Sequence, residues 1–237
     1  MTASAMPLMG HLGELRSRLI KSLLAVGVGS IIAFTFNEQI LDFLVEPYRA
    51  VDPEATLAFF RPTEAFSLVM RISLWGGTLL ASPVIFYQLW RFVAPALTKR
   101  EKRWVIPLVA VLVLLLGAGL VVGYWSMSRG LTFLFEFGGE SLEPIIGADE
   151  YLRFAMRFLL AFGVSFCFPV FVFAAAAAHV VDSAGLRRGR RWTAIIILVS
   201  AALITPTGDP LTLVLLSVPM YVLYEITILA VRFILHR

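Results

Sequence analysis

The chain has 237 residues, of which 59% are hydrophobic and only 15% are charged, and its mean hydropathy is +0.86. A soluble domain cannot bury so large an apolar fraction in one core, so we expect lipid to be part of its solvent. The formal net charge of +4 does not indicate a nucleic-acid partner, because the basic residues stand in short clusters between apolar runs, where they set membrane topology.

Six apolar segments approach the length of about 20 helical residues that a bilayer core requires. They cover residues 19–36, 66–90, 104–125, 154–178, 192–204 and 211–231. Leucines on one face of residues 1–18 predict an interfacial helix before the first span. We expect outer loops at 37–65, 126–153 and 205–210. The sequence therefore predicts a single all-α, polytopic membrane domain over residues 1–237.

The first outer loop, 37–65, is the longest connection. The steps Val45-Glu46-Pro47 and Arg61-Pro62-Thr63 are expected to break helices, and apolar residues between them predict short pieces packed as a cap.

Helix breakers and length also shape the later spans. Segment 192–204 is only about 20 Å long as a helix, which favours local thinning of the bilayer. Segment 211–231 is long enough only if Glu225 lies inside it, so we expect two short final spans. Four prolines are predicted to kink the spans into a curved wall. They are Pro83, Pro107, Pro169 and Pro219.

Charged residues sort to opposite ends of the six segments. With six spans both termini share one side, and 14 of the 20 basic residues lie on that side. Of the 16 acidic residues, 12 lie on the other. Because an excess of lysine and arginine marks cytoplasmic loops, we predict that both termini are cytoplasmic.

No catalytic motif stands out in the sequence. It lacks His-Glu-x-x-His, a phosphate-binding loop and Gly-x-Ser-x-Gly. The three histidines, His11, His179 and His236, are too scattered for a metal site, and Cys167 stands alone in an apolar run, where it is expected to pack as a small apolar residue. We therefore predict a protein that is not an enzyme and that uses no metal or cofactor.

Two acidic residues lie in basic surroundings. Glu14 precedes Arg18 by one helical turn, and the spacing favours an i,i+4 ion pair worth a few tenths of a kcal/mol. Glu101 is the only acid between Arg91 and Arg103, which favours a solvated charged loop. Alternatively, the two carboxylates bind a cationic ligand, since guanidinium groups fit carboxylates in bidentate geometry.

Residues 11–19 (HLGELRSRL) resemble the N-terminal signature of the TatC family, the core of the twin-arginine translocase. Further similarity runs through 82–97, which contains SPVIFYQLW and FVAPAL, and through 101–103 (EKR). Later matches are FGVSF at 162–166, Thr205-Pro206 and PMY at 219–221. The similarity therefore extends over nearly the whole chain.

The resemblance implies a glove-shaped, six-helix receptor in the bacterial cytoplasmic membrane. It would bind twin-arginine signal peptides of folded cargo and work with TatA- and TatB-type single-span partners, driven by the proton motive force. We expect a homo-oligomer within that larger complex. Glu14 and Glu101 would contact the paired arginines of the signal peptide, with Phe92 and Leu97 nearby, and Arg16 is assigned to the same site.

Other positions would carry structural or partner contacts. Pro47 matches a proline in the family's first outer loop, and Pro206 and Asp209 belong to its last outer turn, where residues 207–210 differ from the simplest family form. Cys167 replaces a glutamate or glutamine that the family commonly carries in its fourth span. Gln88, or a polar residue of a partner, would compensate for that loss.

Two other classes of function compete with translocation. A secondary transporter for a small cationic solute would need ionisable residues around a midplane cavity and repeat symmetry, and the sequence shows neither clearly. An intramembrane hydrolase would need a nucleophile and a base at membrane depth; His179 is the only membrane-adjacent histidine and no nucleophile motif accompanies it.

Overall fold

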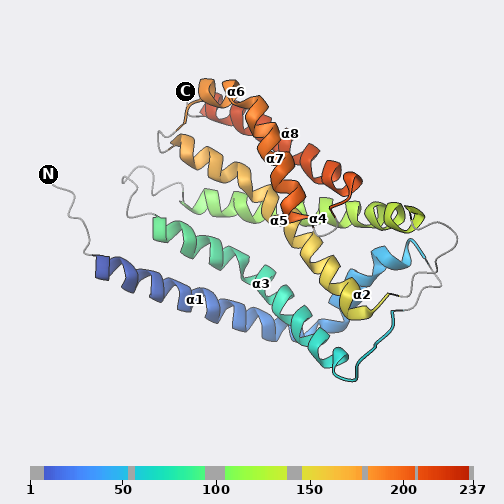
Figure 1. Cartoon of the computed structure of the whole chain (residues 1–237). Coiled ribbons are helices and arrows are strands. Elements are labelled where there is room, and N and C mark those ends of the chain that lie inside the picture. Colours follow the sequence, from blue (N-terminus) through green and yellow to red (C-terminus); the bar gives the residue numbers. More distant parts are fainter. Residues whose placement is uncertain are drawn as a thin grey trace. The chain divides into compact units, whose positions relative to one another are not determined.

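The computed structural model describes residues 8–52, 57–93, 105–137, 146–177, 181–205 and 208–234 (Figure 1). Helices dominate this part of the chain, and one isolated parallel β-bridge joins Ala58 to Gly147. The helices are α1 (Leu8–Thr35), α2 (Asn37–Arg49), α3 (Glu64–Val93), α4 (Val105–Phe137), α5 (Ala148–Ala177), α6 (Ser183–Arg188), α7 (Arg190–Ile204) and α8 (Pro210–Ile234).

Five of these helices are long and apolar enough to cross a membrane, judged by length and composition. The qualifying stretches are Leu12–Thr35, Glu64–Phe92, Ile106–Phe137, Ala148–Ala177 and Pro210–Phe233. Each contains one of the segments predicted as spans, apart from one or two terminal residues. Helix α7 matches the predicted segment 192–204 but has only 15 residues.

The helix ends differ from the bounds predicted for the spans and loops. Helix α1 runs without a break through residue 18, so an interfacial helix and a first span are one element. The expected loop 126–153 is largely helical, because α4 continues to Phe137 and α5 begins at Ala148. Helix α8 has 25 residues, so only one of the two final helices is short.

Pro47 does not break a helix as expected; it lies inside the last turn of α2, which continues to Arg49. Pro83, Pro169 and Pro219 likewise lie inside α3, α5 and α8. Each lacks the N–H that would bond to the carbonyl one turn earlier, and lipid-buried helices tolerate such a gap where neighbouring helices cover it.

The chain divides into two compact units. The first comprises residues 1–40 and 66–113 and contains α1 and most of α3. These helices meet at Gly29 and Gly77: a Cβ built on Gly29 would lie 2.5 Å from the Gly77 carbonyl oxygen. Only glycine at both positions permits this approach, as at small-residue contacts between membrane helices generally.

The second unit comprises residues 41–65 and 114–237 and is organised around α5. About 56% of the apolar window of α5 is buried, the largest share among the five candidate spans. Its aromatic residues Phe154, Phe158 and Phe162 contact one another in a row as tilted ring pairs, with successive ring centroids 5.5 and 4.8 Å apart. Helix α8 packs against α5, and α6 and α7 pack against α8.

Glycines also allow α4 and α5 to pack closely. A Cβ on Gly119 would lie 2.8 Å from the Cα of Gly163, and a Cβ on Gly123 would lie 3.4 Å from Leu159 Cδ2. As the residue number of the contact increases along α4, from 119 to 123, that of its partner decreases along α5, from 163 to 159, so the two helices are antiparallel. The small-xxx-small pair of α4 therefore serves packing within the chain.

A cap formed by α2 and the segments around residues 58 and 147 covers one end of this unit. The Tyr151 hydroxyl donates to the Leu44 carbonyl oxygen of α2 at 2.8 Å, and the Tyr48 ring lies 5.0 Å from the Tyr151 ring. Backbone bonds of 3.3 and 2.9 Å at Ala58 tie the segments together. The expected cap of short pieces is therefore present in the described residues.

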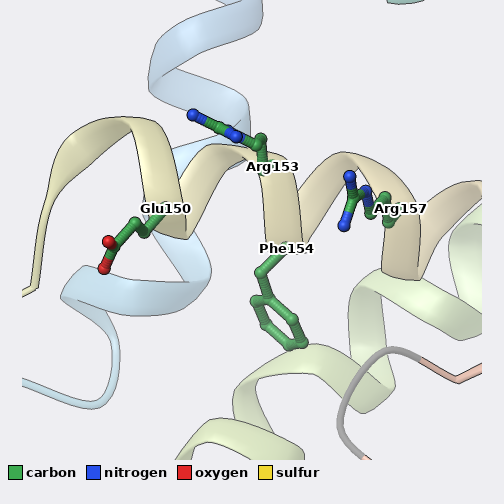
Figure 2. Close-up of a pocket in the computed structure, with 4 residues that line it drawn as sticks. All are labelled: Glu150, Arg153, Phe154 and Arg157. Atoms are coloured by element: carbon green, nitrogen blue, oxygen red, sulfur yellow. The ribbon is translucent and has the colours of Figure 1, made fainter.

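The exposed face of α5 beside this cap carries a surface cavity. Glu150, Arg153, Phe154 and Arg157 line it, all from the first three turns of α5 (Figure 2).

Candidate guanidinium-binding site

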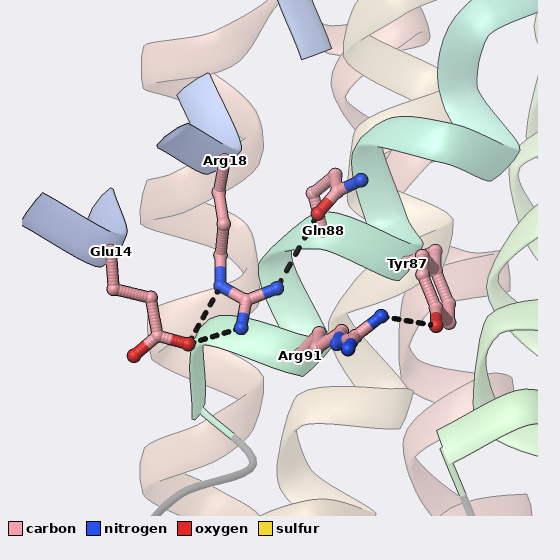
Figure 3. Close-up of polar contacts among 5 residues, drawn as sticks. All are labelled: Glu14, Arg18, Tyr87, Gln88 and Arg91. Carbon is pink, nitrogen blue, oxygen red and sulfur yellow. Dashed lines mark hydrogen bonds and ion pairs between the residues drawn. The ribbon is translucent and has the colours of Figure 1, made fainter. Parts of the chain in front are cut away.

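Glu14 lies on α1, one turn before Arg18, and the two side chains form an ion pair (Figure 3). Arg18 Nε donates to Glu14 Oε1 at 3.1 Å, and Arg18 Nη2 contacts the same oxygen. Both side chains are half-buried, with 23% of Glu14 and 14% of Arg18 exposed. The i,i+4 pair expected from the spacing is confirmed.

Gln88 of α3 completes this contact from a second helix. Arg18 Nη1 donates to Gln88 Oε1 at 3.4 Å, so the guanidinium lies between a carboxylate and an amide carbonyl (Figure 3). Antiparallel packing explains the meeting: Arg18 lies eleven residues before Gly29 on α1, and Gln88 lies eleven residues after Gly77 on α3. The Gly29–Gly77 contact therefore sets the two side chains at one level.

A second arginine lies one turn along α3. Arg91 Nη1 donates to the Tyr87 hydroxyl at 3.0 Å, and the Arg91 guanidinium carbon lies 5.8 Å from the centroid of the Tyr87 ring. Tyr87 and Gln88 thus each hold an arginine at this end of the α1–α3 pair (Figure 3).

The sequence-predicted site is only partly described. Arg16 is exposed on α1, and Phe92 is half-buried in the last turn of α3. Leu97 and Glu101 lie outside the described residues.

Residues 10–219 match the family model for the Sec-independent protein translocase protein (TatC). The chain belongs to the TatC family. It is 37% identical to the TatC protein of Frankia casuarinae over 95% of this chain and 65% of that protein, which is therefore substantially longer. It is 34% identical to TatC of Carboxydothermus hydrogenoformans, over 97% of this chain and 94% of that protein. It is 39% identical to TatC of Aquifex aeolicus, over 94% of this chain and 93% of that protein.

Solved structures agree with this assignment. The chain is similar to a crystal structure of the twin-arginine translocase receptor TatC, with a TM-score of 0.78 and 36% identity over 96% of this chain and 100% of that one. A second TatC structure, in DDM, gives a TM-score of 0.80 and 38% identity over 93% and 99%. As a member of this transport family, the chain is a multi-pass membrane protein of protein translocation.

The predicted structural positions of this TatC chain have distinct environments. Pro47 is buried in α2. Cys167 is buried in α5, and its thiol contacts the Gly163 carbonyl oxygen at 3.4 Å, so it packs as a small residue within the helix core as expected. Pro206 lies outside the described residues. Gln88 contacts Arg18, a partner that the sequence analysis did not assign to it.

Asp209 is the N-cap of α8. Its Oδ1 accepts from the Thr212 backbone N–H at 2.8 Å, and its Oδ2 accepts from the Thr212 hydroxyl at 2.5 Å. Pro210 follows at the first helical position, where a missing N–H costs nothing. This residue therefore starts the final helix.

Sequence reasoning did not single out the α5 cluster of Glu150, Arg153 and Arg157. A signal was present, because two arginines one helical turn apart near the start of an apolar span are costly unless they face polar groups.

Proposed function

We propose that this TatC protein is the translocase receptor that binds twin-arginine signal peptides of folded proteins at the cytoplasmic face of the membrane. One observation carries the proposal: Glu14 and Gln88 together hold a guanidinium, that of Arg18. The arrangement of carboxylate and amide oxygens accepts the group that defines the proposed ligand.

Displacement of Arg18 by a ligand arginine is energetically accessible. A ligand guanidinium would make with Glu14 the same kind of charge-assisted bond that Arg18 makes, so the exchange replaces one such bond by another. A ligand with two adjacent arginines gains further if a second carboxylate is within reach, and we assign that role to Glu101. Arg16, Phe92 and Leu97 complete the proposed site.

The topology of the proposal follows from charge and length. Basic clusters lie at both termini and between α3 and α4, and an excess of basic residues favours the cytoplasmic side of the membrane for these segments. We include α7 as a sixth span, although 15 residues reach only about 22 Å, because its exposed side chains include the apolar Trp192, Ile196 and Leu203. Thinning of the bilayer beside α7 is the expected result.

The proposed partners are TatA- and TatB-type single-span proteins, and the proposed energy source is the proton motive force. Family membership favours this function over a secondary transporter for a cationic solute. Large exposed apolar side chains along α1, such as Leu23, Leu24 and Ile31, offer lipid or partner helices an apolar surface.

The test is photo-cross-linking of a twin-arginine signal peptide to the full chain in membranes. We expect E14Q to reduce cross-linking about tenfold and E14Q with E101Q to abolish it, since charge-assisted bonds to arginine contribute more than 1.4 kcal/mol each. The matched control is E38Q, which removes an exposed carboxylate at the opposite end of the α1–α2 region. Unchanged cross-linking in the double variant, with membrane insertion intact, would contradict the proposal.

A further inference from the structure

The antiparallel register of α4 and α5 places charged residues of the two helices at common levels. Gly119 faces Gly163. Six residues further along α4 is Trp125, and six residues back along α5 is Arg157. Ten residues in each direction lead to Arg129 and Arg153. Trp125 and Arg157 therefore lie at one depth, and Arg129 and Arg153 at another, about 6 Å beyond it.

This depth coincides with the expected edge of the hydrocarbon. From residue 105 to 125 on α4, and from 157 to 177 on α5, each helix rises about 30 Å, the thickness of a bilayer core. Trp125 is exposed, as interfacial tryptophans are, and the Arg129 guanidinium carbon lies 3.6 Å from the centroid of its ring. Arg153 and Arg157 thus lie at headgroup depth.

The cluster on α5 forms one continuous face. Glu150, Arg153, Phe154 and Arg157 line a cavity of about 320 Å³ (Figure 2). Their spacing of three and four residues places them at neighbouring positions on the helix surface. The face continues into the exposed apolar side chains of Val164, Phe168 and Phe171. A polar cavity above an apolar strip has the layout of a headgroup above its acyl chains.

The charges of the cavity select the headgroup. Arg153 pairs with Asp149, and among the described residues no acidic side chain pairs with Arg157. An exposed arginine at headgroup depth can bind a lipid phosphate, and a phosphodiester matches the guanidinium fork. Because Arg153 already pairs with Asp149, Arg157 and Glu150 remain in the lining as one cation and one anion, which favours a zwitterionic lipid over a multiply anionic one.

We propose that this face of α5 binds the headgroup of an amino-phospholipid. Arg157 and Arg153 hold the phosphodiester, and the Glu150 carboxylate accepts hydrogen bonds from the ammonium group. A quaternary choline headgroup offers no N–H to Glu150, so ethanolamine is preferred. Phe154 and the apolar strip below it support the acyl chains. The inference is independent of signal-peptide binding, because it rests on α4 and α5 alone.

The experiment is native mass spectrometry of the full chain in detergent with an equimolar mixture of phosphatidylethanolamine, phosphatidylglycerol and phosphatidylcholine of matched acyl chains. We expect ethanolamine lipid to predominate among bound lipids. R157Q should lower that adduct about tenfold, as loss of a charge-assisted pair does, and R157K should lower it less. R49Q is the matched control, because Arg49 is an exposed arginine of α2 that pairs with Asp42 and does not line the cavity.

Two further arms decide the headgroup and the source of the phosphate. E150A should remove the preference for ethanolamine over choline while retaining choline lipid, and excess inorganic phosphate should not displace bound lipid. Equal adducts in the wild type, R157Q and R49Q would overturn the site. Preferential retention of phosphatidylglycerol by the wild type, or displacement by inorganic phosphate, would overturn the assignment of the ligand.

Discussion

Gly29 of α1 and Gly77 of α3 pack backbone against backbone, with no room for a side chain on either. A Cβ on Gly77 would lie 2.4 Å from the Ser30 backbone nitrogen. The contact fixes the register in which Arg18 meets Gln88, eleven residues away on each helix. Backbone approach at one level of the pair therefore determines which polar side chains meet at another.

Replacement of Gly77 by alanine should destabilise the first unit. Overpacking of this kind costs about 1–3 kcal/mol, because the helices must separate to admit the methyl group. Thermal unfolding in detergent measures the loss. The matched control is G27A on α1, because a Cβ at Gly27 meets nothing within 4 Å. Alanine has a higher helix propensity than glycine, so this variant should be as stable as the wild type or slightly more stable. Equal stability of G77A and G27A would contradict the close contact.

The cap of α8 gives a second prediction. D209A removes the acceptor for the Thr212 N–H and should destabilise the protein by about 1 kcal/mol. D209N retains a capping oxygen and should remain near the wild type. Comparing the melting temperatures of the two variants separates capping from the negative charge. A loss of equal size in D209N would assign the effect to the charge.

Tyr151 links the long α5 to the cap. Y151F removes the hydrogen bond to the Leu44 carbonyl oxygen and leaves that buried oxygen without this donor, at a cost of about 1–3 kcal/mol. Amide hydrogen exchange should accelerate in α2 and around Ala58, while exchange in α8 stays unchanged. Uniform acceleration throughout the protein would indicate that the bond supports global stability rather than the cap.

Tyr48 predicts a loss of cap stability at alkaline pH. Burial raises the pKa of Tyr48 above the ordinary tyrosine value of 10.0, and the nearby Asp52 carboxylate raises it further. A pKa raised in the folded state gives a contribution that is present below pH 10 and is lost as pH rises through the folded pKa. Y48F should therefore lose less stability than the wild type as the pH rises above about 10, in thermal unfolding scans. Identical pH profiles would contradict the burial effect.

Much of the architecture could be predicted from the sequence, because the physics involved is local. A continuous run of about 20 apolar residues indicates a helix that crosses the bilayer. The motif around Glu14 was sufficient to indicate the TatC family. The i,i+4 pair with Arg18 was predictable for the same reason, since helical spacing alone brings the two side chains together.

Helix ends were predicted less well, because hydropathy reports where lipid begins and not where the helix stops. Helices α4 and α5 continue beyond the apolar stretch into the cap, where aromatic contacts such as Tyr48 with Tyr151 stabilise them. Pro47 was expected to break α2, but packing holds the last turn together around it.

By itself, the sequence determined the membrane class, the approximate spans, the family and the identity of Glu14 as the acid beside an arginine. Only the tertiary structure decided that Gln88 shares that arginine and that Arg157 lies level with Trp125. The division has a physical reason. Hydropathy and helical periodicity are encoded over a few turns, whereas contacts between helices depend on the register in which glycines let two backbones approach.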